Sequence, residues 1–341
     1  MRRPAGRILT RIRAGLPSPK HARRVDSPLA TRIRFETQKR RMAKKLPHPI
    51  PYQGSKRMLA PMIYPLLPSG IATFYEPFAG SAAMTLFAAH HGVAKRYVLG
   101  DTLEPIIDLW ASIIERPSKT SKQYAQIWQG QATASADYFN RVRERYNAEK
   151  DPVDLLYLIC RCVKNAVRFN GGGRFTQSHD KRRLGMAPDK MEAAIAGAST
   201  LLRGKTEFRK GDWTKTTADA TPNDFVYMDP PYMGTSIGRD KRYHQQLLPD
   251  DLIVGLNALN SRSIRFALSY DGMTGEKEYG PELPSSLGMT RLLLHAGRSS
   301  QATLQGKSDQ TIESLYLSGN LKAPSEKVFR QPKDMQAALA L

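Results

Sequence analysis

The feature that most constrains the fold lies in residues 73–101, where two apolar runs flank a loop of small residues and an alanine-rich stretch. We expect a strand that ends near Tyr75, a helix over residues 81–90 closed by Gly92, and a second strand over residues 96–101. A strand, a crossover helix and a second strand form the repeating unit of a parallel α/β sheet. The segment therefore predicts an α/β fold.

The alternation of strands and helices stops after this unit and later resumes. From about residue 116 to residue 204 the pattern is mainly helical, with one glycine-rich basic segment, RFNGGGRFTQSHDKRR. Beyond it the sequence indicates a helix over residues 249–260 and strands over residues 224–229, 264–270, 290–296 and 312–318. We therefore expect an α/β domain from residues 47–115 and 205–321, a mostly helical insert over residues 116–204, and a weakly ordered tail over residues 322–341.

Positive charge is concentrated at the N-terminus. Of a formal net charge of +21, residues 1–45 carry +13, which leaves +8 for the remaining 296 residues. Residues 1–46 are rich in Arg, Pro and Ser and lack a sustained apolar period, so we expect disorder there. Three interpretations stay open: a nucleic-acid-binding arm, an organellar transit peptide, or untranslated sequence upstream of a start at Met42. The intact mass of protein made from the native gene separates the third from the others.

The composition also narrows the class of protein. A strongly positive charge favours a polyanionic partner, with nucleic acid as the first candidate. No apolar run approaches the length of a membrane span, and we expect no membrane partner. Cys160 and Cys162 are too few for a disulfide framework or a four-cysteine zinc site. We expect these cysteines, like His90 and His91, to be structural, and the protein to work in the cytoplasm.

The loop EPFAGSA has the properties of a ligand-binding turn. Its small residues let a ligand approach the backbone, and the helix that follows offers free N–H groups. Asp101 lies 21 residues after Gly80, at the end of the next expected strand, where an acid can hold the two hydroxyls of a ribose. The loop lacks a phosphate-binding glycine fingerprint, which favours a nucleoside cofactor without phosphates. An ordinary tight turn between strand and helix is the alternative.

The stretch FVYMDPPYMG, residues 225–234, ends a strand abruptly. Asp229 and two prolines follow an apolar run, at the strand end where open α/β sheets bind ligands. Consecutive prolines fix the backbone and remove competing donors. The stretch therefore predicts a reaction site, with a rigid turn as the plain alternative.

Together these motifs resemble the Dam-type DNA adenine methyltransferases, which use S-adenosylmethionine. The resemblance runs from about residue 50 to residue 320 and keeps the family's order, in which the cofactor loop precedes the recognition insert and the catalytic tetrapeptide comes last. It rests on PYQGSK, EPFAGSA, LGDT, VRFNGGGRF, DPPY and RSSQATLQGKSDQTIESLYL. It implies a Rossmann-like class I methyltransferase sheet with helices on both faces, plus an inserted, mostly helical DNA-recognition domain.

The resemblance also implies roles for individual residues. It assigns cofactor binding to Tyr52, Lys56, Phe78, Gly80, Asp101 and Asp229. It assigns catalysis to Asp229, Pro230 and Tyr232, and DNA binding to Arg168, Asn170, Arg174, Lys181, Arg182 and Arg183. Asp212 and Trp213 would surround the cofactor's adenine, although a core tryptophan explains Trp213 equally well. The family usually has Asn where this chain has Leu103, and Phe-Asn where it has Phe175-Thr176, so the target sequence stays open.

The expected chemistry is methylation of the exocyclic amine of adenine in double-stranded DNA. The lone pair of this amine is conjugated into the ring, so a site must make it available. Asp229 and the carbonyl of Pro230 would accept its two N–H groups, and Tyr232 would stack on the base after it leaves the duplex. Such a transfer needs no metal. The alternatives are methylation of RNA or another amino group, and a non-catalytic DNA-binding relative. A restriction endonuclease that acts on the same site, in a bacterium or phage host, is a candidate partner.

Overall fold

A computed structural model describes residues 46–131, 136–231, 247–274, 277–298, 310–325, 327–332, 334–335 and 337. Residues 46–341 form one compact unit by their contacts. Three expectations lie outside the described residues: the disorder of the N-terminal arm, the position of Tyr232, and residues 299–309 of the motif RSSQATLQGKSDQTIESLYL, which resembles the family's polar hairpin and closing strand. None of the helices among the described residues is long and apolar enough to cross a bilayer.

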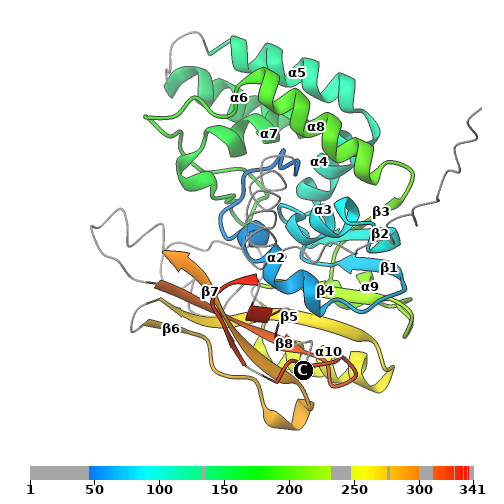
Figure 1. Cartoon of the computed structure of the whole chain (residues 1–341). Helices are drawn as coiled ribbons and strands as arrows, with labels where there is room; N and C mark the ends of the chain where they lie inside the picture. Colours follow the sequence, from blue (N-terminus) through cyan, green and yellow to red (C-terminus); the bar gives the residue numbers. More distant parts are fainter. Residues whose placement is uncertain are drawn as a thin grey trace, which may run out of the picture. The chain divides into compact units, whose positions relative to one another are not determined.

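A mixed nine-stranded sheet forms the centre of the described structure (Figure 1). The strand order is β3-β2-β1-β4-β5-β8-β7-β9, and β6 pairs with β5. Neighbouring strands are parallel from β3 to β5, and β8 lies antiparallel between β5 and β7. The strands are β1 (Ile71–Glu76), β2 (Ala94–Asp101), β3 (Thr206–Lys210), β4 (Phe225–Met228), β5 (Arg265–Thr274), β6 (Lys277–Tyr279), β7 (Thr290–Arg298), β8 (Gln310–Leu317) and β9 (Val328–Phe329).

The strand order reverses between β1 and β4. The chain moves outward from β1 through β2 to β3, and then returns to place β4 on the other side of β1. In open parallel sheets the crevice at such a switch point, beyond the carboxyl ends of the strands, is where ligands bind. Glu76 ends β1, and Asp229 directly follows β4. The predicted loop and tetrapeptide therefore lie at the ligand-binding edge of this sheet.

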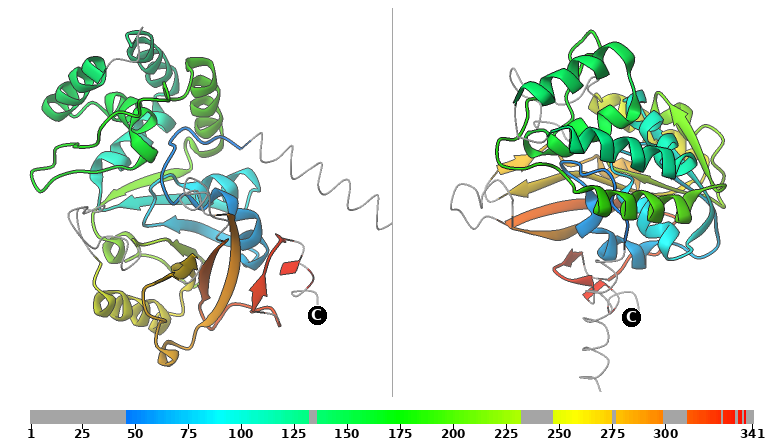
Figure 2. Two further views of the ribbon diagram at one scale, coloured as in Figure 1. Left: turned by 90° about the vertical axis from the view of Figure 1, so that its left-hand side faces the viewer. Right: turned by 90° about the horizontal axis from the view of Figure 1, so that it is seen from above.

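Helices cover both faces of the sheet (Figures 1 and 2). The larger apolar core joins one face to α3, α4 and the helices between β2 and β3, and the smaller core joins the other face to α10. The expected Rossmann-like α/β fold is confirmed. The helices are α2 (Ala60–Ile63), α3 (Ala83–His90), α4 (Glu104–Glu115), α5 (Pro117–Gln129), α6 (Ala136–Glu149), α7 (Pro152–Arg161), α8 (Pro188–Leu202), α9 (Trp213–Thr216) and α10 (Pro249–Ser261). Short 3₁₀ turns occur at η1 (Lys56–Met58), η2 (Tyr64–Leu66), η3 (Val163–Asn165) and η4 (Ser285–Leu287).

Helices α5 to α8 gather at one end of the described structure, where the sequence predicted a helical insert (Figure 1). Their apolar side chains continue the core of the sheet rather than forming a separate one. Arg161, only 1% exposed, donates from Nε to Oε1 of Gln131 (3.0 Å) and from Nη1 to the carbonyl of Asp180. This buried network fixes one end of the glycine-rich basic segment to α7.

Three local expectations differ from the structure. The stretch DLLYLICRCVKNAV, residues 154–167, favours a helix throughout, but α7 ends at Arg161, because Lys164 and Asn165 adopt left-handed backbone angles (φ 58° and 51°). β3 was not expected, since its alternating charged residues have a weak apolar signal. The segment expected to be a weakly ordered tail contributes β9, whose fully buried Phe329 pairs with Leu294 of β7.

Candidate active site

The loop between β1 and α3 has an unusual backbone. Gly80 has φ +44° and Ala82 has φ +47°, so the chain turns twice through the left-handed region before α3 begins. The carbonyl of Gly80 accepts a hydrogen bond from Nε1 of the buried Trp110 (2.9 Å). A Cβ on Gly80 would lie 3.5 Å from the ring of Tyr52, so a larger side chain would fill the space at the loop. The loop is a cradle that needs glycine at this position.

Asp101 holds this loop from the end of β2. Its Oδ2 accepts the N–H of Gly80 (3.0 Å), and its Oδ1 accepts the N–H of Leu103 (2.9 Å). Burial raises the pKa of Asp101 to about 6, although both backbone hydrogen bonds oppose the shift. A carboxylate oxygen has more than one lone pair, so each oxygen of Asp101 can still accept a hydrogen bond from a hydroxyl group.

The motif PYQGSK packs against the same loop. Tyr52 lies over Gly80, and the Ser81 hydroxyl donates to that of Ser55 (2.8 Å). The next residue, Lys56, begins the short turn η1. The structure thus brings together two predicted cofactor motifs that are about 25 residues apart.

Lys56 lies between two carboxylates. Its Nζ is 2.8 Å from Oδ1 of Asp229 and 3.3 Å from Oε2 of Glu313, and it donates to the carbonyl of Gly54 (3.2 Å). Its side chain is 7% exposed, against 22% for Asp229 and 18% for Glu313. Burial alone would lower the pKa of Lys56, but the two carboxylates outweigh it and raise the pKa above its ordinary value. Lys56 is therefore charged.

Sequence reasoning missed Glu313. Along β8 it occupies the same face as Leu315 and Leu317, both fully buried. The sequence did contain a signal for this residue, because an acid that alternates with two leucines along a strand lies on the same, buried face.

Glu76 is a second missed carboxylate. It is 3% exposed and accepts the N–H groups of Met84 (3.4 Å) and Thr85 (2.7 Å) in the first turn of α3. Burial raises its pKa to about 8; the bonds to Thr85 oppose this shift and the charge of Asp229 adds to it. Glu76 thus ties the end of β1 to the start of α3, and with it the loop between them.

Phe78 and Trp213 lie against each other, with ring centroids 6.0 Å apart. Trp213 is 2% exposed and belongs to the smaller core, which favours the structural interpretation of this residue. Asp212 caps α9 by accepting the N–H of Thr214 (2.8 Å). Pro230 is buried beside the half-buried Asp229.

The basic segment is ordered largely by its own side chains. Oδ1 of Asn170 accepts the N–H groups of Gly172 (3.1 Å) and Arg174 (3.0 Å), which closes the glycine-rich turn. The guanidinium of Arg174 lies 2.5 Å from Glu144 of α6. Arg168 is half-buried, and its carbonyl accepts the N–H of Thr176 (3.0 Å).

The second half of the basic segment contains both ion-paired and exposed basic side chains. Arg183 donates to Oδ2 of Asp180 (2.8 Å) and to Oδ1 of Asn165 (3.3 Å). Hydrogen bonds from the N–H of Arg182 and from Arg183 hold the pKa of Asp180 below its usual value. The side chains of Lys181 and Arg182 are exposed. Asn165, in η3 just before the basic segment, also accepts the N–H of Gln53 through its carbonyl (3.3 Å), so Asn165 links Arg183 to the PYQGSK motif.

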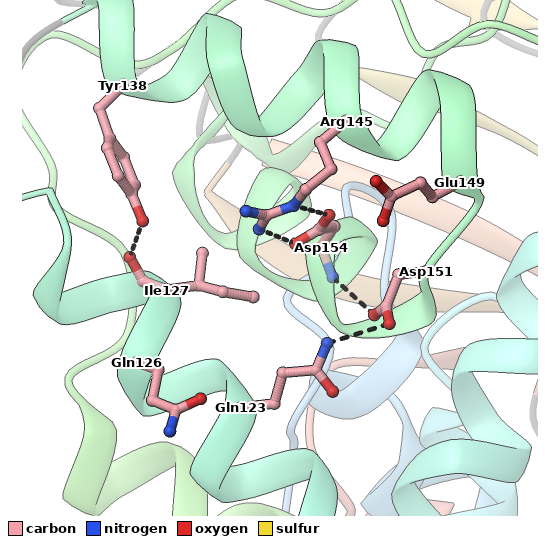
Figure 3. A pocket seen from close by; sticks show the side chains of 8 residues that line it. All are labelled: Gln123, Gln126, Ile127, Tyr138, Arg145, Glu149, Asp151 and Asp154. Atoms are coloured by element: carbon pink, nitrogen blue, oxygen red, sulfur yellow. Dashed lines mark hydrogen bonds and ion pairs between the residues drawn. The ribbon is translucent and has the colours of Figure 1, made fainter.

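A separate pocket lies among α5, α6 and α7 (Figure 3). Its main ion pair joins Arg145 to Asp154 (2.5 Å), and Asp151 caps α7 while accepting from Gln123 (3.0 Å). None of its lining residues belongs to the predicted site. Its charged groups hold the helices together.

The fold and the loop define an open α/β sheet with a Lys–Asp pair beside a glycine loop at its switch point. Residues 52–298 match the family described as D12 class N6 adenine-specific DNA methyltransferase. Because this match spans well over half of the sequence, the chain belongs to that family, and the resemblance to the Dam-type enzymes is confirmed at this level.

Similar proteins include two named methylases. The chain is 24% identical over 293 residues to the type II methyltransferase M.FokI of Planomicrobium okeanokoites, covering 83% of this chain and 45% of that protein. It is 28% identical over 236 residues to the modification methylase StsI of Streptococcus sanguinis, covering 66% of this chain and 35% of that protein. A DNA N-6-adenine-methyltransferase of Escherichia phage P1 is 23% identical over 186 residues, covering 53% of this chain and 23% of that protein. The chain thus spans less than half the length of these relatives.

Proposed function

We propose that this chain transfers the methyl group of S-adenosylmethionine to the exocyclic amine of adenine in double-stranded DNA. The observation that carries the proposal is the Lys56–Asp229 ion pair (2.8 Å) beside the glycine loop at the switch point of the sheet. Membership of the adenine methyltransferase family supports the same reaction.

The residues at the loop fit a nucleoside cofactor. Asp101 has oxygens at the cradle that can accept the ribose hydroxyls, and the ring of Tyr52 packs against Gly80. We propose that Tyr52 and Phe78 line the cofactor and that Lys56 and Asp229 face its methionine end. S-adenosylmethionine supplies, when bound, a methyl group on a positively charged sulfur. An amine nitrogen can attack the methyl carbon in line with its bond to sulfur, and the sulfur is the group displaced.

The chain's own residues prepare the amine. Asp229 accepts one N–H and the carbonyl of Pro230 the other, which holds the lone pair toward the methyl group. Both acceptors stabilise the positive charge that develops on nitrogen as its bond to carbon forms and the sulfur keeps the electrons of the broken bond. The extra proton then leaves nitrogen through the Asp229 carboxylate to water. Tyr232 would stack on the base, which must leave the duplex to reach the site.

We propose that the helices from α5 to α8 and the basic segment form the DNA-recognition insert. Lys181 and Arg182 are exposed and suit phosphate contacts, and Asn170, Arg168, Arg174 and Arg183 organise the segment as well as contacting DNA. A restriction endonuclease for the same sequence is a proposed partner, since two relatives are named as a type II methyltransferase and a modification methylase.

One experiment tests the reaction. The full chain is incubated with S-adenosylmethionine labelled in its methyl group and, in separate reactions, with duplex DNA or with RNA, and the nucleic acid is digested to nucleosides. We expect the label in N6-methyl-2′-deoxyadenosine. Label in another nucleoside, or transfer to RNA alone, would replace this proposal with another amino-group methyltransferase. Absence of transfer to either nucleic acid, despite DNA binding, would leave a non-catalytic DNA-binding protein.

A further inference from the structure

The Lys56 ammonium is shared by two carboxylates from different strands. Asp229 follows β4, and Glu313 lies on β8 two strands away in the sheet. Among the residues that the structure describes, three acceptors lie within 3.3 Å of Nζ of Lys56: these two carboxylates and the carbonyl of Gly54. A buried ammonium needs one opposite charge to be neutralised, and Asp229 alone would provide it. Glu313 brings a second negative charge to the same ammonium.

The position of Glu313 is built into the sheet. A bulge between Ser269 and Gly272 of β5 shifts the register with β8 and places Glu313 opposite Gly272. A Cβ on Gly272 would lie 2.5 Å from the carbonyl oxygen of Ile312 and 3.3 Å from the Cα of Glu313, so only glycine permits this approach. The bulge and the glycine together bring the carboxylate to the end of an otherwise apolar strand face.

The shared ammonium is next to the cofactor cradle. Ser55, the neighbour of Lys56, bonds to Ser81 of the cradle (2.8 Å), and Ser81 follows Gly80. Asp101 holds the other side of Gly80. Lys56, with Asp229 and Glu313 beside it, is therefore tied to the cradle through Ser55, whereas Asp101 holds the cradle at the N–H of Gly80.

We propose that Glu313 is a positioning residue that shares the Lys56 ammonium with Asp229, so that the three groups together keep a net negative charge for a positively charged sulfur and for the amine. This inference rests on the proposed function and extends it to a residue on β8. Without the charge of Glu313, the full positive charge of Lys56 would lie against Asp229 and cancel it. The site would then lose its preference for a cation, although its shape would be unchanged.

Two ligands that differ in one charge test this proposal. S-adenosylmethionine has a positively charged sulfur, and S-adenosylhomocysteine has a neutral one. The dissociation constants of both are measured by calorimetry for the full chain and for the Glu313→Gln and Glu282→Gln variants. Glu282 is the control, because its carboxylate is 64% exposed and pairs with Arg291 (2.9 Å) rather than with Lys56.

We expect Glu313→Gln to lower the affinity for the cationic ligand relative to the neutral one by about tenfold, a moderate effect because the site is partly exposed. Glu282→Gln should leave the ratio of the two affinities unchanged. Glu313→Asp keeps the charge, so it should retain most of the preference for the cationic ligand. An unchanged ratio in Glu313→Gln, or an equal loss of both ligands, would overturn the proposal. If Glu313→Gln does not fold, the comparison moves to Glu313→Thr, whose side chain suits a strand. Failure of the unmodified chain to bind either ligand would instead refute the proposed function.

Discussion

At the scale of single residues, the site combines groups that local sequence reveals with groups that it does not. Lys56, Gly80, Asp101 and Asp229 follow from short motifs whose spacing and strand positions have chemical reasons. Glu313 does not, because only the pairing of β8 with β5 brings it to Lys56. The burial of a carboxylate determines much of its pKa, and this burial likewise cannot be predicted from the linear sequence.

Asp229 carries the first prediction. Replacing it with Ala should lower kcat for DNA methylation by at least about a hundredfold, because the amine loses the acceptor that stabilises its developing charge. The variant should remain folded, since Lys56 keeps Glu313 as a partner at 3.3 Å. Methylation rates and thermal unfolding by circular dichroism measure the two effects, with Glu282→Gln as control. A kcat within a few-fold of the unmodified chain would remove Asp229 from catalysis.

Glu76 gives a prediction on pH. Its pKa is about 8 in the folded protein, above the ordinary glutamate value of 4.5, so between these two values the folded state binds more protons than the unfolded state. Stability is therefore highest at the acidic end of this window and falls as pH rises through it, by up to a few kcal/mol since each pKa unit is worth about 1.4 kcal/mol.

The measurement is the free energy of unfolding in urea from pH 5 to pH 9. Glu76→Gln imitates the neutral carboxyl, so we expect its stability to fall less steeply with pH than that of the unmodified chain. The difference between the two curves isolates Glu76 from Asp101, whose pKa is raised to about 6 by burial. Parallel curves would show that Glu76 is ionised in the folded protein.

At the scale of elements, the sequence predicted regular structure well and irregular backbone poorly. The first strand–helix–strand unit is found where expected, because its periodicity and its glycine act locally. The end of α7 was misplaced, because tertiary contacts hold Lys164 and Asn165 in left-handed conformations that apolar periodicity does not report. β9 was missed because a two-residue strand has no period of its own.

The basic segment carries a prediction on DNA binding. The exposed Lys181 and Arg182 should contribute phosphate contacts, whereas Arg183 is held by Asp180 and Asn165. The double variant Lys181→Ala and Arg182→Ala should weaken DNA binding by a similar factor on all sequences and reduce the salt slope by about 2. Cofactor affinity should not change. Fluorescence anisotropy at several salt concentrations measures the slope.

A matched control changes the same number of positive charges elsewhere. Lys210→Ala and Arg209→Ala remove two cations at β3, where they pair with Asp108 (2.6 Å) and Asp219 rather than joining the basic segment. These substitutions should leave the slope nearly unchanged. An equal effect from both pairs would show that net charge, and not the basic segment, determines the affinity.

At the scale of the whole molecule, charge and structure are unevenly distributed. The unit from residue 46 onward contains the sheet, the cradle and the Lys56 cluster, yet residues 1–45 carry +13 of the net charge of +21. Chemistry and long-range attraction for DNA can therefore be separated by removing the arm. Deleting residues 1–45 should reduce the magnitude of the slope of log affinity against log salt concentration by several units, because each phosphate neutralised contributes about 0.9 to that slope. The affinity for S-adenosylhomocysteine should be unchanged, since every residue of the cradle remains.

A second variant distinguishes charge from chain length. An arm of the same length with its 11 arginines replaced by glutamine should behave like the deletion if phosphate neutralisation is the cause. Association rates by stopped flow should fall in both variants and become less sensitive to salt, because electrostatic steering depends on the same charges. If the deletion alone slows association and the glutamine arm does not, the arm acts through its length or sequence, and the attraction for DNA belongs to the folded unit.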